Sequence, residues 1–509
     1  MSQKTETNHL FSEIRSRMPS ADKPFLIIPG GESITYGEMV ARSARFANAL
    51  VGLGVKPGDR VAVQVEKSPA ALFLYLGCVR AGAIFLPLNQ AYTPAEIEYF
   101  LGDAKPTVFV CDPGKADALA PFAKAAGAAL ETLGKDSKGS LTDKAQAASP
   151  EFADVARGPD DLAAILYTSG TTGRSKGAML SHENLASNAR VLVEEWRFTG
   201  KDVLLHALPI FHTHGLFVAT NVILFAGASM IFLAKFDADE IMTLMPQATT
   251  MMGVPTFYVR LVDHPRLTRD ATAHMRLFIS GSAPLLAETH REFEAKTGHA
   301  ILERYGMTET NMNTSNPYDG DRIAGTVGFP LPGTDLRVTN PDTAAVLGPD
   351  EIGMIEVRGP NVFKGYWQNP EKTAAEFRAD GFFITGDLGK VDASGYVHIV
   401  GRGKDLIITG GYNVYPKEIE GEIDAMPGVN ESAVIGIAHR DFGEGVTAVV
   451  VPSKGATLSE AAIVKALEGR LAKFKQPKRV IIVDELPRNT MGKVQKNVLR
   501  ETYKDLYKA

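Results

Sequence analysis

Short apolar segments alternate with helix-like segments through most of this 509-residue chain, and this alternation constrains its fold more than any other feature. Residues 61–65 and 84–87 have the apolar character of buried strands, whereas residues 70–79 and 94–101 have a helical pattern. Strands and helices that alternate in this way form layered α/β structures. With 45% hydrophobic residues, a chain of this length can bury a large core and form more than one domain.

The pattern changes after residue 401 to a smaller unit of mixed strands and helices. Strand-like segments lie at residues 406–409, 433–437, 446–451 and 480–483, and helix-like segments at residues 416–426 and 459–471. We predict a large N-terminal domain of layered α/β subdomains (residues 1–401) and a small, mobile α+β domain (residues 402–509). Within the first domain, the polar and weakly periodic residues 132–159 are predicted to be a solvated connection.

Composition argues against several classes of function. The formal net charge of −5 gives no basic field of the kind that nucleic-acid binding uses. Cys78 and Cys111 lack metal-type spacing and are expected to be inert core thiols in a reducing compartment. The first 18 residues resemble neither a secretory signal nor a transit peptide, so we expect a cytoplasmic protein.

Residues 203–234 contain no Asp, Glu, Lys or Arg and are long enough to raise the question of a membrane span. Pro209, Asn221, three histidines and two glycines interrupt the segment. We therefore predict a strand, a loop and a buried helix here, and no contact with a membrane.

A run of small, hydroxylated and flexible residues, Tyr-Thr-Ser-Gly-Thr-Thr-Gly-Arg-Ser-Lys-Gly, occupies residues 167–177 between an apolar strand and a helix-like segment. Glycine permits close approach of the backbone to an anion, and the hydroxyl groups, N–H groups and Lys176 can bind phosphate. The spacing is not that of a Walker A loop. A flexible surface linker is the alternative, but the length and the preceding strand favour a phosphate-binding loop. The residues expected to bind the β- and γ-phosphates are Thr168, Ser169, Gly170, Thr171, Thr172, Gly173 and Lys176.

Four further stretches follow this loop along the chain. They are Glu-Arg-Tyr-Gly-Met-Thr-Glu at residues 303–309, Thr-Gly-Asp at 385–387, Gly-Arg-Gly-Lys-Asp at 401–405 and Pro-Arg-Asn-Thr-Met-Gly-Lys at 487–493. In this order the five stretches resemble the signatures of the adenylate-forming enzymes, the superfamily of acyl-CoA synthetases, firefly luciferase and peptide-synthetase adenylation domains. The resemblance runs from about residue 24 to the end of the chain. It implies an acyl-CoA synthetase-like fold and a reaction that uses ATP, Mg²⁺ and coenzyme A and releases AMP.

The resemblance also implies a nucleotide site. Tyr305 is expected to stack on adenine, with Gly306 and Met307 beside it, and Asp387 to accept hydrogen bonds from the ribose hydroxyls, assisted by Arg402. Taken alone, Tyr305 could be a core aromatic residue, and Asp387 could cap a Gly-Asp turn. Glu309 supplies a hard oxygen ligand for Mg²⁺, and Thr171 is the second expected ligand.

Catalysis of adenylation depends on positioning and on neutralising charge. Lys493 by itself would be interpreted as a surface charge, but it matches the catalytic lysine of the superfamily, which stabilises charge that develops in the transition state. Thr308, Glu309 and Arg402 complete the expected catalytic set. Acetylation of Lys493 by a lysine acetyltransferase would remove its charge, and this suggests a means of regulation.

The second half-reaction needs a thiol, and no cysteine of this chain is placed as a nucleophile, so coenzyme A is the expected acceptor. By resemblance, the C-terminal domain turns about a hinge at Lys404, withdraws Lys493 and presents Gly410 and Gly411 to form the coenzyme A tunnel. Glycine suits a narrow tunnel because it allows close approach of the backbone.

Arg304 directly precedes the tyrosine expected to bind adenine, and a buried cation is costly unless it meets an anion. A small dicarboxylic acid would supply that anion, whereas pairing of Arg304 with Glu303 or Glu309 is the alternative. The pocket is expected to lie between His212 and residues 253–258, 280–284 and 303–308, and to include Ser280, Gly281 and Met307. Lys235 and Arg291 are reserve candidates for the distal carboxylate. The stretches at residues 303–314 and 212–215 resemble those of the malonate–CoA ligases, which implies malonate and, second, methylmalonate as substrates.

Three alternatives stay open at this point. They are a ligase for a short monocarboxylic acid such as acetate or propionate, an adenylation enzyme that loads a carrier protein, and a catalytically silent nucleotide sensor. A sensor could dispense with Glu309 and Lys493, and both are present.

Overall fold

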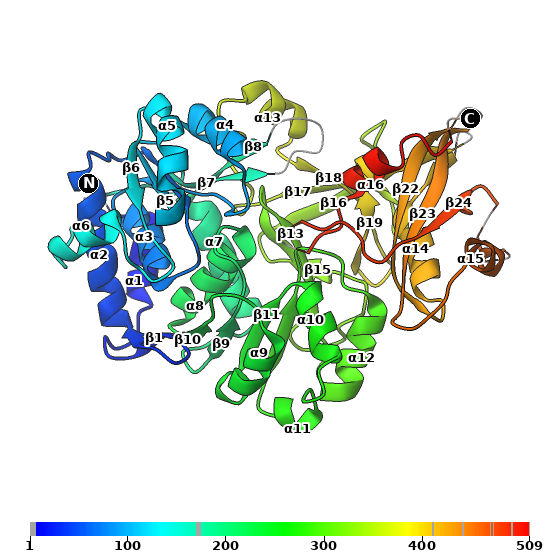
Figure 1. Cartoon of the computed structure of the whole chain (residues 1–509), viewed down its shortest axis with the longest axis horizontal. Helices are drawn as coiled ribbons and strands as arrows, with labels where there is room; N and C mark the ends of the chain where they lie inside the picture. Colours follow the sequence, from blue (N-terminus) through cyan, green and yellow to red (C-terminus); the bar gives the residue numbers. More distant parts are fainter. Residues whose placement is uncertain are drawn as a thin grey trace.

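The computed structural model describes residues 7–168, 175–409, 412–439, 442–468, 470–471, 473–489 and 492–507. Three sheets lie before residue 403, and a fourth lies after it, at the opposite side of the molecule from the N-terminus (Figure 1). This confirms the predicted class, a large α/β N-terminal part and a small C-terminal part. The exact domain boundary at residues 401 and 402 stays a prediction.

The six-stranded sheet contains the first strands that the sequence predicted. Its strands are parallel except for β8, which pairs antiparallel with β7. The order is β6 (Ala129–Thr132), β5 (Val108–Cys111), β3 (Arg60–Gln64), β4 (Ile84–Pro87), β7 (Leu162–Thr168) and β8 (Lys176–Ser181). Helices α3 (Pro69–Arg80), α4 (Pro94–Ala104), η1 (Pro113–Lys115), α5 (Ala116–Ala126) and α6 (Ser140–Ala147) make the crossovers.

The nine-stranded sheet has a parallel centre and antiparallel ends. Its order is β15 (Phe329–Pro330), β14 (Asn311–Ser315), β13 (Leu302–Met307), β12 (Leu277–Ser280), β11 (Thr250–Gly253), β9 (Val203–His206), β10 (Ser229–Phe232), β1 (Pro24–Ile27) and β2 (Ser33–Thr35). The accompanying helices are α1 (His9–Ser16), α2 (Tyr36–Gly52), α7 (His182–Glu195), η2 (His214–Thr220), α8 (Asn221–Ala226), α9 (Ala238–Leu244), η3 (Met245–Gln247), α10 (Pro255–Val262), α11 (Arg269–Thr272) and α12 (Ala287–Thr297).

The two large sheets share one core, and helices fill the space between them. The largest hydrophobic cluster joins β3 and β7 of one sheet to β1 and β9 of the other through α2, α3, α7 and α8. Separate clusters lie on the outer faces, under α4 and α5 on one side and under α9, α10 and α12 on the other. Every residue of α3 from Ala70 to Arg80 is buried, as expected for a helix between two sheets.

A four-stranded antiparallel sheet links the large sheets to the C-terminal unit. It contains β16 (Asp335–Thr339), β17 (Gly353–Arg358), β18 (Phe383–Val391) and β19 (Val397–Arg402), with α13 (Pro370–Glu376) before β18. The chain then forms a single turn, η4 (Gly403–Asp405), and enters the last sheet. The end of β19 therefore leads directly into the predicted hinge.

The C-terminal sheet has helices on both faces (Figure 1). Strands β21 (Tyr412–Val414), β20 (Ile407–Thr409), β23 (Gly443–Pro452) and β22 (Val429–His439) lie in that order, and β24 (Arg479–Ile482) pairs with β23. Helices α14 (Pro416–Asp424) and α15 (Glu460–Leu467) share one cluster with the sheet, and α16 (Lys496–Thr502) packs on the other face.

Two sequence predictions need correction. Residues 132–159 are not only a solvated connection, because they include α6, whose Leu141, Thr142 and Ala145 are buried and which packs on α2. The glycine-rich run does not lead into a helix either: β8 follows it, so the run joins the two strands of an antiparallel hairpin. A helix of eight residues with few apolar positions gives a weak periodic signal, and the small residues of β8 resemble those of a helix.

Two other predictions are confirmed. Residues 203–234 form β9, η2, α8 and β10, and Cys78 and Cys111 are free and buried. Burial raises the pKa of both thiols, that of Cys111 to about 11. Among the described residues, helices with the length and hydropathy of a membrane span are absent.

Candidate active site

The candidate site lies at the carboxyl ends of the parallel strands of the nine-stranded sheet. Gly253, Ser280 and Glu303 occupy matching positions on β11, β12 and β13, and His206 ends β9. Ligands of open α/β sheets bind at this edge because the loops that leave the strands converge there. The residues predicted to line the acid pocket lie at these strand ends or in the loops that follow them.

Arg304 is a buried cation with unsatisfied donors. Its side chain lies on β13 against Gly281, where a Cβ atom would be 2.4 Å from the guanidinium carbon. Among the described residues, its Nε and Nη2 atoms have no hydrogen-bond partner. Burial lowers the pKa of Arg304 to about 9, so the group is still charged at neutral pH.

The acids that could have neutralised Arg304 are engaged elsewhere. Glu303 contacts His290 at 3.0 Å and accepts a hydrogen bond from the Gly325 N–H, and Glu309 contacts Tyr366. The reserve cations of the sequence analysis, Lys235 and Arg291, have exposed side chains. Of these three cations, Arg304 is the one that is buried with donors to spare, and an anionic ligand would satisfy them.

Two histidines face Arg304 and are held neutral. Burial, and then the charges of Arg304 and Lys493, lower the pKa of His212 to about 4. Burial also lowers the pKa of His214, whose Nδ1 lies 3.1 Å from Ser282 Oγ and whose Nε2 has no partner among the described residues. Ser282 has a φ of 74°, which is unusual for a residue other than glycine. Neutral imidazoles beside a guanidinium can donate hydrogen bonds to a carboxylate without adding charge.

Tyr305, Asp387 and Arg402 form a second group. Asp387 Oδ2 accepts a 2.5 Å hydrogen bond from the Tyr305 hydroxyl, and Arg402 Nε lies 2.7 Å from Asp387 Oδ1. The structure corrects one detail, since Asp387 lies within β18, directly opposite Arg402 on β19, and not in a turn. The pairing of these strands therefore holds the carboxylate and the guanidinium together beside the tyrosine.

The sharp connection between β13 and β14 carries Met307, Thr308 and Glu309. Gly306 is required here because a Cβ atom would lie 1.9 Å from the Asn311 carbonyl oxygen. Thr308 and Glu309 lie in the turn itself, Thr308 half-buried and Glu309 buried. The tight turn places the expected magnesium ligand next to the expected adenine site.

Lys176 and Glu309 meet in one polar network. The Lys176 Nζ atom lies 4.5 Å from the Tyr366 ring centroid and 3.5 Å from Glu376 Oε1, and the Tyr366 hydroxyl lies 3.1 Å from Glu309 Oε1. Thr168 ends β7 and donates a long hydrogen bond to the Lys176 carbonyl. The other predicted phosphate-loop residues, Ser169, Gly170, Thr171, Thr172 and Gly173, lie outside the described residues.

Lys493 extends from the C-terminal unit to this site. Its loop is closed by the hydrogen bond from Asn489 N–H to the Lys493 carbonyl and by the one from Lys493 N–H to Asn489 Oδ1, both 2.9 Å. The preceding Gly492 lies against Thr256 at the start of α10, with 3.0 Å from an added Cβ to Thr256 Cγ2. Surrounding protein and the charge of Arg402 lower the pKa of Lys493 to about 8, although its side chain is accessible to solvent. Lys493 therefore lies within the electrostatic reach of Arg402 and Asp387.

Lys404 lies in η4, the single turn between the third sheet and the C-terminal sheet. Its side chain is exposed, and the neighbouring Asp405 is held by Arg500 of α16 at 2.6 Å. The predicted tunnel residues Gly410 and Gly411 lie outside the described residues.

Sequence reasoning missed Tyr366 and Glu376. Neither lies in a motif whose spacing indicates chemistry, and both reach the site through tertiary contacts. His214, Ser282 and Thr256 lie within stretches expected to surround the acid, residues 212–215, 280–284 and 253–258.

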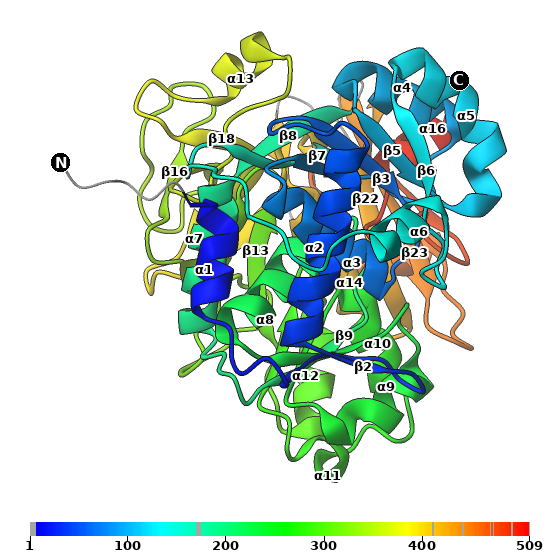
Figure 2. The ribbon, with the colours of Figure 1, turned by 90° about the vertical axis from the view of Figure 1, so that its left-hand side faces the viewer.

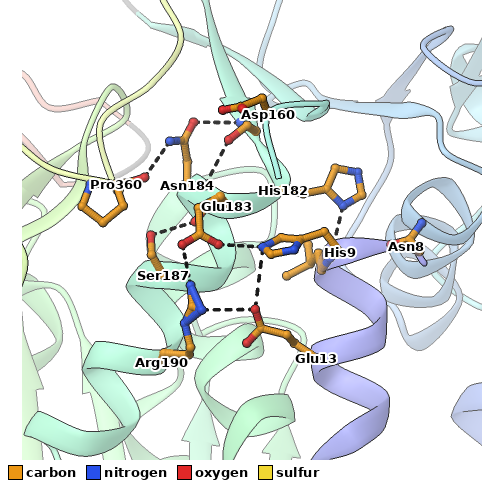
Figure 3. Close-up of polar contacts among 12 residues, drawn as sticks. Asn8, His9, Glu13, Asp160, His182, Glu183, Asn184, Ser187, Arg190 and Pro360 are labelled. Carbon is orange, nitrogen blue, oxygen red and sulfur yellow. Dashed lines mark hydrogen bonds and ion pairs between the residues drawn. The ribbon is translucent and has the colours of Figure 1, made fainter. Parts of the chain in front are cut away.

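A separate polar cluster ties the first helix to α7 (Figures 2 and 3). His9 Nε2 lies 2.6 Å from Glu183 Oε2, and Arg190 donates hydrogen bonds to both Glu13 and Glu183. These three acid and imidazole side chains are close enough to share a cation. Because Arg190 already hydrogen-bonds both carboxylates, the cluster is interpreted as a structural tie.

The fold and this site are typical of an enzyme, and comparison with known proteins identifies the family to which the chain belongs. The AMP-binding enzyme family matches residues 14–367, and the AMP-binding enzyme C-terminal domain matches residues 418–493, so the chain belongs to this family.

Individual relatives are similar along almost the whole chain. ATP-bound MatB from Rhodopseudomonas palustris is 67% identical, with a TM-score of 0.97 over 98% of this chain and 99% of MatB, whereas the apo form of MatB gives 0.85. A feruloyl-CoA synthase from Amycolatopsis is 38% identical over 93% of this chain and 95% of its own length. The malonate–CoA ligase of Arabidopsis thaliana is 32% identical over 98% and 91%.

Proposed function

We propose that this protein is an ATP-dependent malonate–CoA ligase. It activates malonate as an acyl-adenylate and transfers the acyl group to coenzyme A, with AMP and pyrophosphate as the other products. The observation that carries the proposal is the buried guanidinium of Arg304, whose Nε and Nη2 atoms have no partner among the described residues. Burial, and then the charge of Arg304, lower the pKa of His212 and His214. Malonate–CoA ligases among the relatives support the same substrate.

Malonate fits because it is a short dianion. Arg304 binds the distal carboxylate, and Ser280, Gly281, His212 and Met307 surround the acid. The Ser280 hydroxyl is also buried without a partner among the described residues, and a second carboxylate oxygen would satisfy it. Methylmalonate carries the same two carboxylates and is the second substrate.

The nucleotide lies across the other groups of the site. Tyr305 stacks on adenine beside Gly306 and Met307, Asp387 accepts hydrogen bonds from the ribose hydroxyls, and Arg402 orients Asp387. Lys176 and the hydroxyl-rich loop after Thr168 contact the β- and γ-phosphates.

Glu309 fits a magnesium ion. It is a buried carboxylate, 6% exposed, whose pKa is raised by burial, and a cation would offset the cost of its charge. Thr171 is the second proposed ligand. When bound with ATP, Mg²⁺ neutralises charge that shifts onto pyrophosphate.

Adenylation requires a carboxylate oxygen of malonate to attack the α-phosphorus while the bond to pyrophosphate breaks. Lys493 bridges the attacking carboxylate and the α-phosphate, which keeps two anions together. Thr308, Glu309 and Arg402 complete the catalytic set. The higher similarity to ATP-bound than to apo MatB supports this domain arrangement as the adenylating one.

Coenzyme A is the acceptor in the second step, because both cysteines are buried core thiols. Its sulfur attacks the acyl carbon, and AMP leaves. The small domain, residues 402–509, turns about Lys404 to withdraw Lys493 and bring Gly410 and Gly411 to the tunnel. The partners of the reaction are thus small molecules, and the reaction takes place in the cytoplasm. Acetylation of Lys493 by a lysine acetyltransferase would remove its charge and switch the enzyme off.

The alternatives predict different products. A ligase for acetate or propionate has no use for a buried cation beside the acid, and a carrier-loading enzyme transfers to a protein thiol. A silent sensor forms no product.

One screen tests the proposal. Pyrophosphate and AMP release are measured with malonate, methylmalonate, succinate, acetate and butyrate, each with and without coenzyme A. We expect malonate to be preferred and malonyl-CoA to form only with coenzyme A. A preference for acetate would overturn the substrate, and no release with any acid would overturn the enzyme class.

A further inference from the structure

Tyr366 lies where the phosphate and magnesium ends of the proposed site meet. It belongs to the segment between β17 and α13 and is 4% exposed. Its ring face carries the Lys176 ammonium group at 4.5 Å, and its hydroxyl lies between two carboxylates, 3.1 Å from Glu309 and 2.6 Å from Glu376. One side chain thus contacts a cation through its ring and two acids through its hydroxyl.

Glu376 supplies the counter-charge. It ends α13, lies 3.5 Å from Lys176 and 2.7 Å from Lys372, and has no place in the motifs of the sequence. Burial alone would raise its pKa, but hydrogen bonds from Lys372 and Tyr366 and the charge of Lys176 lower it below the usual range. Glu376 is therefore an anion that holds Lys176 from one side.

The hydroxyl geometry divides these contacts unequally. A phenol has a single proton to donate, and the shorter distance is to Glu376. The proton therefore goes to Glu376, and Glu309, whose Oε1 lies 3.1 Å from the hydroxyl, keeps its lone pairs for another ligand. Lys176 is likewise held at 3.5 Å, which is too long for a strong hydrogen bond, so its protons are available to an anion.

We propose that Tyr366 is a positioning residue that, together with Glu376, sets the separation between Lys176 and Glu309. This inference rests on the function proposed above, in which Lys176 binds the terminal phosphates and Glu309 binds the magnesium ion. Tyr366 and Glu376 therefore fix the distance at which the protein binds the two parts of one metal–triphosphate complex. Neither Tyr366 nor Glu376 contacts the acid or the reacting atoms.

The role of Tyr366 and Glu376 resembles that of residues that contact a metal ligand, but not the metal, and orient the ligand. Removing such a group typically weakens metal binding by about 10–100-fold while the ligand itself remains. In Tyr366→Phe the ring still carries Lys176, but the hydroxyl that lies between Glu309 and Glu376 is lost. In Glu376→Gln the Tyr366 proton is free to turn to Glu309 and compete with the metal. Both changes should affect magnesium-dependent binding and spare metal-free binding.

Isothermal titration calorimetry of the full-length enzyme with ATP, in the absence of any acid, measures binding without turnover. Titrations at increasing MgCl₂ give the concentration for half-maximal tightening, and titrations in EDTA give metal-free affinity. We expect Tyr366→Phe and Glu376→Gln to raise the magnesium requirement by about 10–100-fold and to leave the EDTA affinity unchanged. Glu371→Gln, the same substitution at the exposed start of α13, is the matched control and should behave as wild type.

The inference is overturned if neither variant changes the magnesium requirement, or if affinity falls equally with and without the metal, as a general structural defect would cause. If Tyr366→Phe does not fold, Glu376→Gln alone decides. Wild-type enzyme that fails to bind ATP with magnesium would overturn the proposed function as well, whereas normal wild-type binding with unaffected variants would overturn only the role of Tyr366 and Glu376.

Discussion

At the scale of single residues, Arg304 is the most informative side chain. The ligand-free enzyme carries a buried guanidinium with unpartnered donors, which lowers the free energy of unfolding. Binding of an anion would offset this cost. Function and stability are therefore expected to respond in opposite directions when this charge is removed.

Arg304→Met should lower kcat/KM for malonate, with a loss of transition-state stabilisation of roughly 2–4 kcal/mol, because one side of a buried charge pair is lost in the complex. Activity with acetate should fall much less. The same variant should raise the free energy of unfolding of the ligand-free enzyme by about 1 kcal/mol, since an unpaired buried charge is removed. Kinetics with both acids and urea denaturation measure the two effects. Arg291→Met, on the exposed face of α12, is the control, and a uniform loss with both acids would contradict the assignment.

Lys493 should give the reaction a recognisable pH dependence. Its pKa is lowered to about 8 and only the protonated form can stabilise the developing negative charge, so kcat/KM for adenylation falls as pH rises through about 8. Pyrophosphate release from pH 6 to 10 measures this limb. Lys493→Arg keeps its charge over the whole range and should lose the limb together with most activity. A wild-type profile that is flat to pH 10 would refute the role of Lys493.

At the scale of elements, the turn between β13 and β14 determines whether the nucleotide residues align. Gly306 is opposite Met312 across the two strands, at a point where their register shifts. An added methyl group would collide with the Asn311 carbonyl oxygen. The methyl group and the carbonyl are both fixed to strand backbones, so neither can move away unless its strand moves. The adenine site thus depends on one close approach of two strands.

Gly306→Ala should lower the free energy of unfolding by about 2–3 kcal/mol and weaken AMP binding, because the strands must separate to admit the methyl group. Denaturation and calorimetry measure both. Gly52→Ala, at the end of α2 with nothing within 4 Å of the added Cβ, should be neutral. Normal AMP binding by Gly306→Ala would show that the turn tolerates the strain and that the proposed adenine site lies elsewhere.

At the scale of the whole molecule, the proposed site combines residues of the N-terminal sheets with the C-terminal loop of Lys493. That loop contacts α10 through Gly492 and Thr256, while the chain connection runs through η4. A short connection with one docking loop suits two domain arrangements, one for each half-reaction.

Lys404→Pro tests this directly. Proline restricts φ at the proposed hinge, so adenylation in the present arrangement should persist whereas thioester formation from supplied malonyl-adenylate should fall by at least about 100-fold. Pyrophosphate release and malonyl-CoA formation measure the two steps separately. Arg500→Gln, which loses only the ion pair to Asp405, is the control, and equal retention of both steps by Lys404→Pro would argue against a hinge there.

The amino-acid sequence by itself determined the layered α/β class and most strands and helices, because buried strands and amphipathic helices leave periodic patterns that need no long-range information. It also indicated Arg304, Tyr305, Glu309, Asp387 and Lys493 as site residues, through motifs that resemble a known superfamily. Tertiary structure alone decided that Asp387 lies opposite Arg402 in a sheet, that Arg304 has no acidic partner among the described residues, and that Tyr366 joins Lys176 to Glu309. These relations arise from packing between segments far apart in the chain, and local sequence patterns carry no record of such contacts.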